Sequence, residues 1–201
     1  MTEQELKILF PDRHRILPEL KFGVDAYQEL VHKMVQRKDM LVSRTNEYHG
    51  VWILELCRQA QKSIIAFVDL TDLNAFRLLR PVLEQPDLQV CLMLNQQPDN
   101  PRNRSFVEKM LNLGRLKIVP NKVFSGTTMM VDEMGYFMKI GKSILTHEYE
   151  VSAKQPSKAK AIKEQLIKHW CAPEQLVSHE EIKPAQMQEY VASQMGSLRF
   201  F

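Results

Sequence analysis

The stretch "VWILELCRQAQKSIIAFVDLTDLNAFRLLRPVLEQPDLQVCLML", residues 51–94, alternates helical and extended patterns. "VWILELCRQAQ" has the apolar spacing of a helix, and "KSIIAFV" is a continuous apolar run that predicts a buried strand. "DLNAFRLLRPVLEQ" predicts a second helix, bent or broken at Pro81, and "LQVCLML" predicts a second buried strand. Strands that alternate with helices of about ten residues predict a parallel sheet with helices on its faces.

The pattern continues beyond this stretch and then changes. "RSFVEKMLNLG" predicts a helix that ends at Gly114, and "LKIV" predicts a third strand. "TTMMVD", "YFMKIG" and "SILTHEYEV" predict strands joined by short turns, so the sheet should finish as a hairpin or meander. "QPSKAKAIKEQLIKHW" predicts a helix whose apolar residues can face the sheet. The predicted fold class is therefore α/β, with a mixed β-sheet flanked by helices.

The two ends of the chain differ from this pattern. "LFPDRHRILPELKFG", residues 9–23, has two prolines and scattered apolar residues, which predicts an extended or irregular arm. A helix should follow, with Asp25 as its N-cap, and "SHEEIKPAQMQEYVASQM" predicts one more short helix near the end. We expect an N-terminal arm and helix over residues 1–50, an α/β domain over 51–171 and a helical tail over 172–201.

Length and composition narrow the class of protein. With 201 residues, 44% of them hydrophobic and 25% charged, the chain suits one soluble globular domain with a sizeable core. No apolar run approaches the roughly 20 residues of a membrane span, and the first residues lack the apolar stretch of a signal peptide. We therefore expect a cytoplasmic protein without membrane contact.

Charge and cysteine usage add two further constraints. The net charge of +3 neither proves nor excludes a nucleic-acid partner. The three cysteines lie far apart and lack metal-ligand spacing, so we interpret them as reduced thiols, two of them in the core: Cys57, Cys91 and Cys171.

Residues 141–143, "GKS", match the end of a phosphate-binding P-loop. That motif, G-x-x-x-x-G-K-[ST], needs its first glycine at position 136, where this sequence has Tyr136; Gly135 is one position too early. The motif also needs a strand, a loop and then a helix, whereas "GYFMKIGKSIL" has the aromatic and β-branched pattern of a hairpin. We conclude that the chain has no P-loop.

The order of elements over Val51–Glu150 resembles one half of the phospholipase D superfamily. "VWILELCRQAQKSIIAFV" is similar to that family's helix, alanine-lysine-serine turn and first strand. "LKIVPNKVFSGTTMMVDEMGYFMKIGKS" falls where the family carries H-x-K-x-x-x-x-D, an apolar strand and a Gly-Ser turn. The resemblance covers about half of the chain and implies a phospholipase D-like fold.

Aligned on Asp132, the family pattern puts its histidine at Ser125 and its lysine at Thr127. In the family the histidine attacks phosphorus, and the lysine neutralises the phosphoryl oxygens. A serine is a weak nucleophile unless a base activates it, and threonine carries no charge for the transition state. The resemblance therefore implies a pseudoenzyme with a vestigial motif at Ser125, Thr127 and Asp132.

Other residues close to this motif are candidates for binding a ligand: Lys139, Lys142, Ser143, His147 and Glu148. His147 with Glu148 or Glu150 would make an acid–base pair or a weak metal site; the alternative is a solvated strand edge that carries charges. We interpret His14 and His49 as surface residues. The sequence gives no reason to assign a metal or a cofactor.

The helix predicted over residues 155–170 is rich in lysine. Such a run can contact the phosphates of a nucleic acid, and each neutralised phosphate adds affinity and salt sensitivity. The alternative is the solvated face of an amphipathic helix, in which Glu164 and Lys168 form an ordinary i,i+4 pair. The candidate contacts to nucleic acid are Lys154, Lys158, Lys160 and Lys163.

Three classes of function follow. The first is a non-catalytic binding or regulatory protein that contacts nucleic acid or a phosphorylated ligand. The second is a divergent phosphodiesterase or nuclease in which Lys139, Lys142, His147 or Glu148 replaces the lost residues. The third is a protein-interaction scaffold without a ligand. Phospholipase D relatives with a single half-site resemble obligate dimers, so the resemblance also implies a homodimer that uses the Ser125–Asp132 strand and its neighbours.

Overall fold

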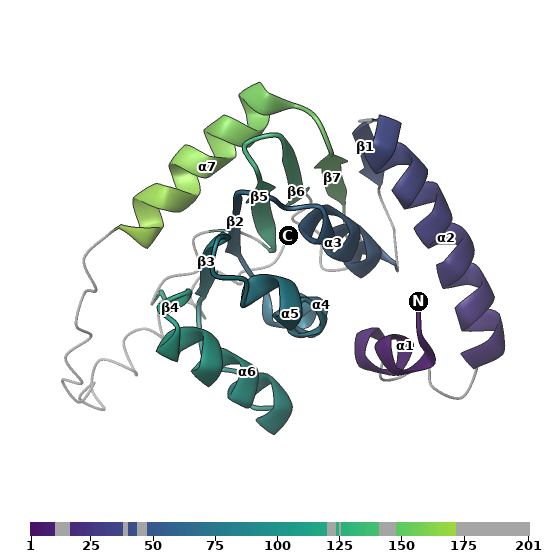
Figure 1. The fold of residues 1–201 in the computed structure, drawn as a ribbon, viewed down its shortest axis with the longest axis horizontal. Helices are drawn as coiled ribbons and strands as arrows, with labels where there is room; N and C mark the ends of the chain where they lie inside the picture. The colour runs from purple at the N-terminus through teal and green to yellow at the C-terminus, as the bar shows by residue number, and fades with distance from the viewer. Residues whose placement is uncertain are drawn as a thin grey trace, which may run out of the picture.

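The structure is a computed structural model that describes residues 1–10, 17–37, 40–43, 48–119, 124, 126–140 and 148–171. Within these ranges one seven-stranded sheet has the order β1-β7-β6-β5-β2-β3-β4 (Figure 1). Its strands are β1 Met40–Ser43, β2 Ser63–Phe67, β3 Gln89–Leu94, β4 Leu116–Ile118, β5 Thr128–Val131, β6 Gly135–Lys139 and β7 Tyr149–Ser152. The pairs β2·β3 and β3·β4 are parallel, and the other neighbouring pairs are antiparallel. The predicted α/β fold with a mixed sheet is confirmed.

Helices cover both faces of this sheet. They are α1 Glu3–Leu9, α2 Leu17–Arg37, α3 His49–Arg58, α4 Leu73–Leu78, α5 Arg80–Leu83, α6 Pro101–Asn112 and α7 Pro156–Trp170, with a 3₁₀ turn over Leu70–Asp72. The break predicted at Pro81 is confirmed, because α4 ends at Leu78 and Pro81 lies in the first turn of α5. The predicted end of α6 at Gly114 is confirmed as well, with a φ of 67° that glycine adopts without strain.

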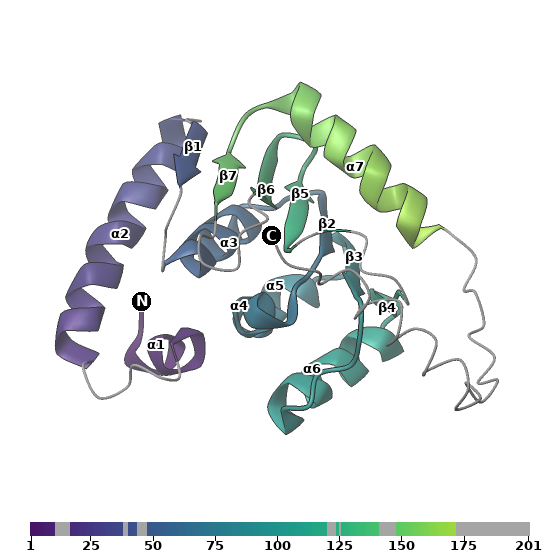
Figure 2. The same ribbon diagram turned by 180° about the vertical axis from the view of Figure 1, so that it is seen from behind.

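Strand alternation produces two cores from one central strand. All five residues of β2 are buried. Ile64 and Ala66 face the larger core, which α3, α4 and α6 cover, whereas Ile65 and Phe67 face a smaller core. The smaller core is covered by the inner face of α7, which runs alone across its side of the sheet (Figures 1 and 2). Its residues from α7 are Ala159, Ile162 and Leu166.

The N-terminal residues are helical where the sequence predicted an irregular arm. Residues 17–23 belong to α2, and Pro18 is tolerated because it is the second residue of that helix, where its missing N–H has no partner to lose. Asp25 is therefore not an N-cap but lies within α2, where it pairs with Lys21. Leu6 and Val24 are fully buried in the same core as Trp52. Residues 11–16 of the predicted arm lie outside the described residues.

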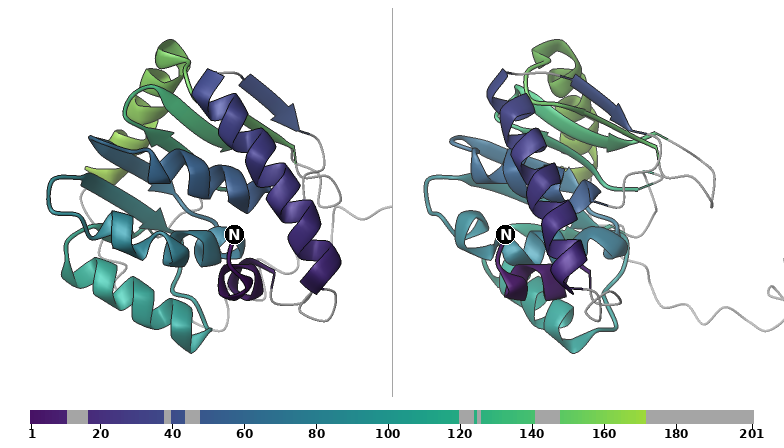
Figure 3. Two further views of the ribbon diagram at one scale, coloured as in Figure 1. Left: turned by 45° about the vertical axis from the view of Figure 1, so that its right-hand side comes forward. Right: turned by 90° about the vertical axis from the view of Figure 1, so that its right-hand side faces the viewer.

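Strand β1 was not predicted from the sequence. It pairs with β7 in antiparallel register, Met40 opposite Ser152 and Ser43 opposite Tyr149, and it follows α2 at the edge of the sheet (Figure 3). The helix predicted near the C-terminus lies outside the described residues. Among the residues that are described, no helix is both long and apolar enough to cross a membrane.

The strand proposed as a dimer surface lies in the interior of the sheet. Strand β5 is hydrogen-bonded to β2 on one side and to β6 on the other, so it has no free edge. Its two faces are also covered, because Met129 and Met130 are completely buried. Residues Thr128–Val131 therefore offer neither a free edge nor an open face to a second copy, and the homodimer stays a prediction.

Leu6→Ala tests whether α1 belongs to the same cooperative unit as the sheet. Leu6 is 0% exposed, so the substitution should lower the free energy of unfolding by about 2–5 kcal/mol. The control Leu113→Ala, at a residue that is 47% exposed, should cost less than about 0.5 kcal/mol. Urea denaturation followed by tryptophan fluorescence measures both. Equal stability of the two variants would mean that α1 is dispensable.

Candidate functional site at the carboxyl edge of the sheet

Several chain segments meet at one end of the strands, where the parallel strands have their carboxyl ends. We call this end of the sheet the carboxyl edge. Strands β2, β3 and β4 end there, β5 and β7 begin there, and α3 begins beside them. In open α/β sheets, ligands bind outside the carboxyl ends of parallel strands, because the loops at this edge leave room for them. The polar side chains gathered at this edge are therefore the candidate functional site.

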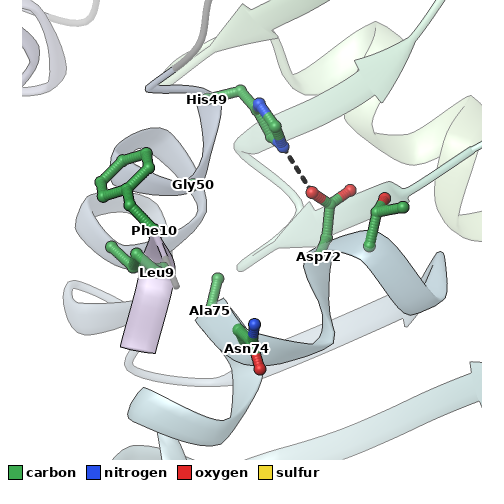
Figure 4. A pocket seen from close by; sticks show the side chains of 8 residues that line it. Leu9, Phe10, His49, Gly50, Asp72, Asn74 and Ala75 are labelled. Atoms are coloured by element: carbon green, nitrogen blue, oxygen red, sulfur yellow. Dashed lines mark hydrogen bonds and ion pairs between the residues drawn. The ribbon is translucent and has the colours of Figure 1, made fainter. Parts of the chain in front are cut away.

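Asp72 is the centre of a hydrogen-bonded group at this edge. Its side chain is only 6% exposed. The Thr127 hydroxyl donates to Asp72 Oδ2 at 2.6 Å, and the imidazole Nε2 of His49 is hydrogen-bonded to Asp72 Oδ1 (Figure 4). The backbone N–H of Asp69 donates to Thr127 Oγ1 at 3.0 Å. The Thr127 hydroxyl is thus used both as a donor and as an acceptor, and it is completely buried.

Two aromatic rings complete this group. His49 stacks on Tyr149 with ring centroids 4.6 Å apart and an interplanar angle of 13°, and Phe137 lies 6.3 Å from the imidazole. Burial raises the pKa of the Tyr149 hydroxyl, and the nearby charges of Asp72 and Asp69 raise it further. Tyr149 therefore stays protonated at neutral pH. The same two carboxylates make this edge electrostatically unfavourable for an anion.

A small hollow opens beside His49 and Asp72. Its volume is about 90 Å³, and it is lined by Leu9, Phe10, His49, Gly50, Thr71, Asp72, Asn74 and Ala75 (Figure 4). Pockets that bury small-molecule ligands have volumes of about 300 Å³ or more. This hollow has room for a few water molecules or one small polar group, and not for a nucleotide.

The structure brings Lys139 next to Thr127. The two are neighbours across β5 and β6, and the Lys139 backbone N–H donates to the Thr127 carbonyl at 3.1 Å. Gly126 makes room for the lysine stem, because a Cβ on this glycine would lie 2.2 Å from Lys139 Cδ. Glu148 is half-buried and its carbonyl accepts from the Ile140 N–H at 2.8 Å. The remaining candidates of this region lie outside the described residues: Ser125, Lys142, Ser143 and His147.

Asp132 lies at the opposite end of the strands from the carboxyl edge. It begins the turn from β5 to β6 with a φ of 53°, and the four residues of β5 separate it from Thr127. Its carboxylate accepts from the backbone N–H groups of Gln61 at 2.8 Å, Lys62 at 2.7 Å and Ser63 at 2.8 Å. The structure therefore gives Asp132 a role in holding the hairpin to the start of β2, away from the carboxyl edge.

The four candidate lysines around α7 fall into two groups, one held in ion pairs and one exposed to solvent. Lys158 pairs with Glu150 and lies over the Tyr136 ring, 5.3 Å from its centroid, while Lys163 pairs with Glu133. Lys154 and Lys160 are exposed. Lys158 and Lys163 therefore fix α7 to the sheet and to the β5–β6 turn, whereas Lys154 and Lys160 present charge to solvent.

Sequence reasoning missed the two central residues of the carboxyl edge, His49 and Asp72. His49 was interpreted as a surface histidine in a loop, but it is the first residue of α3 and its side chain is 24% exposed. One signal was available, since Asp69 and Asp72 follow directly on a buried strand, where polar residues reach the carboxyl edge. Among the residues that the structure describes, no three His, Cys, Asp or Glu side chains are placed to hold a metal ion.

Comparison with known proteins gives a likeness of fold. No protein-family model and no curated protein matches this sequence. Among solved structures, the archaeal chromatin protein TrmBL2 is similar to this chain with a TM-score of 0.55 and 17% identity. The match covers 79% of this chain, which spans 64% of the length of TrmBL2.

Two further structures match more loosely. NUC, a phospholipase D family member from Salmonella typhimurium, is 14% identical over 66% of this chain and 95% of its own, with a TM-score of 0.47. The phosphatidylserine synthase of Haemophilus influenzae is 14% identical over 79% of this chain and 46% of its own, with a TM-score of 0.39.

Asp132→Ala should lower the free energy of unfolding by about 2–3 kcal/mol, because three backbone N–H groups lose a charged acceptor. Asp132→Asn should cost less, since asparagine tolerates the positive φ and keeps one acceptor oxygen. Chemical denaturation of both variants measures the difference. Wild-type stability of Asp132→Ala would contradict the role assigned to this carboxylate.

Glu150 should make stability depend on pH. Burial by itself would raise the pKa of its carboxyl, but hydrogen bonds from Lys158 and Tyr136 hold it below the ordinary value of 4.5. A lowered folded-state pKa adds stability that is complete above pH 4.5 and is lost as the pH falls through the folded-state value. Glu150→Gln should therefore cost about 1–2 kcal/mol at pH 7, and the difference from wild type should shrink below pH 4.5.

Thermal denaturation between pH 3 and 7 (roughly the range over which carboxyl groups titrate) measures this effect. The matched control is Glu164→Gln, at an exposed position of α7, which should change stability by less than about 0.5 kcal/mol. A stability loss in Glu150→Gln that is the same at every pH would contradict the assigned role of the charge.

Proposed function

We propose that this chain is a non-catalytic nucleic-acid-binding protein on a phospholipase D-like fold, with its binding surface on the outer face of α7. The observation that carries the proposal is the division of the lysines on α7 and just before it. Ion pairs of Lys158 and Lys163 hold the helix in place, while Lys154 and Lys160 are exposed. A rigid helix that presents exposed ammonium groups is suited to contact a phosphate backbone.

Further charge lies next to these lysines. Lys62, at the start of β2, and Lys160 both act electrostatically on Glu133, which places them around the same turn as Lys163. Lys168, also exposed, lies two helical turns beyond Lys160 on α7. These residues extend the basic surface from the helix to the β5–β6 turn.

The carboxyl edge supports binding without catalysis. At the position that the resemblance assigns to the family's lysine, Thr127 is buried, uncharged and bonded to Asp72. Asp69 and Asp72 would repel a phosphodiester at this edge, and Thr127 carries no charge that could neutralise its oxygens. A nucleic acid is therefore better accommodated on α7 than at the carboxyl edge.

The likeness to TrmBL2 supports DNA as the first ligand to test. TrmBL2 is described as a chromatin protein with a novel mode of DNA binding. The fold alone does not determine function, so the support from this relative is weaker than that from the lysines.

One observation favours a divergent phosphodiesterase as the second candidate. His49 is paired with the buried carboxylate of Asp72, an arrangement that orients an imidazole for general base catalysis. In this reading Lys139, beside Thr127, would supply the positive charge. Cleavage of a nucleic acid by the wild-type protein that is lost in His49→Ala would establish this alternative and overturn the non-catalytic proposal.

The double variant Lys154→Gln/Lys160→Gln tests the proposal. Binding to fluorescent double- and single-stranded DNA and RNA is measured by anisotropy at several salt concentrations, and substrate integrity is checked afterwards. The wild-type protein should bind and leave the substrate intact. The variant should bind roughly ten times more weakly, and the slope of log Kd against log salt should fall by about 2, one unit for each lost phosphate contact.

The matched control is Lys7→Gln/Lys33→Gln, which removes two exposed lysines of α1 and α2 and gives the same net charge. It should keep the wild-type slope and affinity within about twofold. An equal loss in both variants would mean that binding depends only on net charge. Absence of binding by the wild-type protein at low salt would overturn the proposal.

A further inference from the structure

Two of the three cysteines lie at the same end of α7. Cys91 is on β3, is 6% exposed, and belongs to the smaller core together with Met93 and Leu166. Cys171 is the first residue after α7 and is exposed. The third cysteine, Cys57, lies in α3 and is completely buried in the larger core, on the other face of the sheet.

Contacts at the end of α7 hold it against β3 and β4. The Trp170 side chain packs against the core that contains Cys91. The Lys117 ammonium group donates to the Trp170 carbonyl at 3.1 Å and lies 5.2 Å from the centroid of the Trp170 ring. Lys117 is on β4, opposite Met93 of β3, so these contacts place residues 170 and 171 beside the strand pair that carries Cys91 (Figures 1 and 3).

Two neighbouring groups also shift the pKa of the Cys91 thiol. Burial raises its pKa, the thiol of Cys171 raises it further, and the Lys117 ammonium group lowers it. This influence agrees with the contacts of Lys117 and Trp170, which bring the end of α7 to the strand pair that carries Cys91.

We propose that Cys91 and Cys171 form a redox-active thiol pair, which a peroxide converts into a disulfide that joins the end of α7 to β3. The exposed Cys171 reacts first. Its thiolate sulfur attacks one peroxide oxygen, the O–O bond breaks, and one water leaves after protonation, giving a sulfenic acid. The Cys91 thiolate then attacks this sulfur, the S–O bond breaks, and a second water leaves as the disulfide forms.

The reaction is balanced by one hydrogen peroxide, which takes two electrons and two protons from the two thiols and yields two waters. Lys117 assists the second step because its positive charge favours the thiolate of Cys91. A dithiol reductant reverses the reaction by exchange. The disulfide closes a long loop of chain between β3 and the end of α7, so the oxidised form is expected to unfold at a higher temperature than the reduced form.

The test treats the full chain with one equivalent of hydrogen peroxide, blocks the remaining thiols and maps the disulfide by peptide mass spectrometry under non-reducing conditions. Free thiols, measured in denaturant, should fall from three to one, and one peptide pair should link positions 91 and 171. The thermal midpoint should rise on oxidation and return after reduction with dithiothreitol.

Single substitutions test which cysteines form the disulfide. Cys57→Ser, in the opposite core, should still form the disulfide if the protein folds, and Cys57→Ala serves where serine is not tolerated there. Cys171→Ser, at an exposed position, should fold normally and form no internal disulfide. The proposal is overturned if peroxide oxidises Cys171 while Cys91 keeps its thiol, or if the product is an intermolecular Cys171 disulfide. Neither result depends on whether the protein binds nucleic acid.

Discussion

Three backbone N–H groups converge on a single carboxylate, that of Asp132, and this interaction determines the register at the centre of the sheet. It joins the β5–β6 turn to the start of β2, and both β2 and β5 contribute side chains to both cores. Side chains alternate between the faces of a sheet, so a slip by one residue would exchange the two sets of buried residues. If β5 slipped by one residue against β2, Met129 would face α7 and Met130 would face α3, while Ile64 and Ile65 kept their faces.

The same register assembles the carboxyl edge. With Ile65 opposite Met130 and Phe67 opposite Thr128, the chain just before β5 reaches Asp69 and Asp72, which follow β2. Lys139 comes to the same place because β6 pairs with β5 from Gly135 to Met138 and extends one residue further. A carboxylate at one end of the hairpin therefore positions a threonine at the other end, although the two side chains share no contact.

Local patterns predicted the parts of the fold that depend on neighbouring residues. The buried strands β2 and β3, the broken helix around Pro81 and the end of α6 at Gly114 all follow from apolar spacing and from the backbone limits of proline and glycine. Strand β1 was missed because it is short and pairs with β7, about a hundred residues later in the chain. Pro18 suggested an irregular segment, but the first turn of a helix accepts proline as well.

The site was harder to predict than the fold for a related reason. The partners that decide what each candidate does come from distant segments: Glu133 and Glu150 neutralise two of the four lysines, and Asp72 binds the hydroxyl of Thr127. Helical periodicity places all four lysines in one region and cannot show which of them are paired. In the same way, an alignment on Asp132 gives only the order of Thr127 and Asp132 along the chain. Strand β5 lies between them and places them at opposite ends of the sheet, where they have different partners.

The positions of the charges favour binding over cleavage for a physical reason. The lysines on and just before α7 lie on the side of the sheet that this helix covers, whereas His49, the first residue of α3, and Asp72, directly before α4, lie on segments that cover the opposite side. Under the proposal, a polyanion is attracted to the first surface and repelled by the carboxylates of the second. Catalysis would need a nucleophile or base within hydrogen-bonding distance of the bound phosphate, and an imidazole on the far side of a closely packed sheet cannot reach a phosphate held on α7. This distribution of charges is compatible with a protein that holds a nucleic acid and leaves it intact.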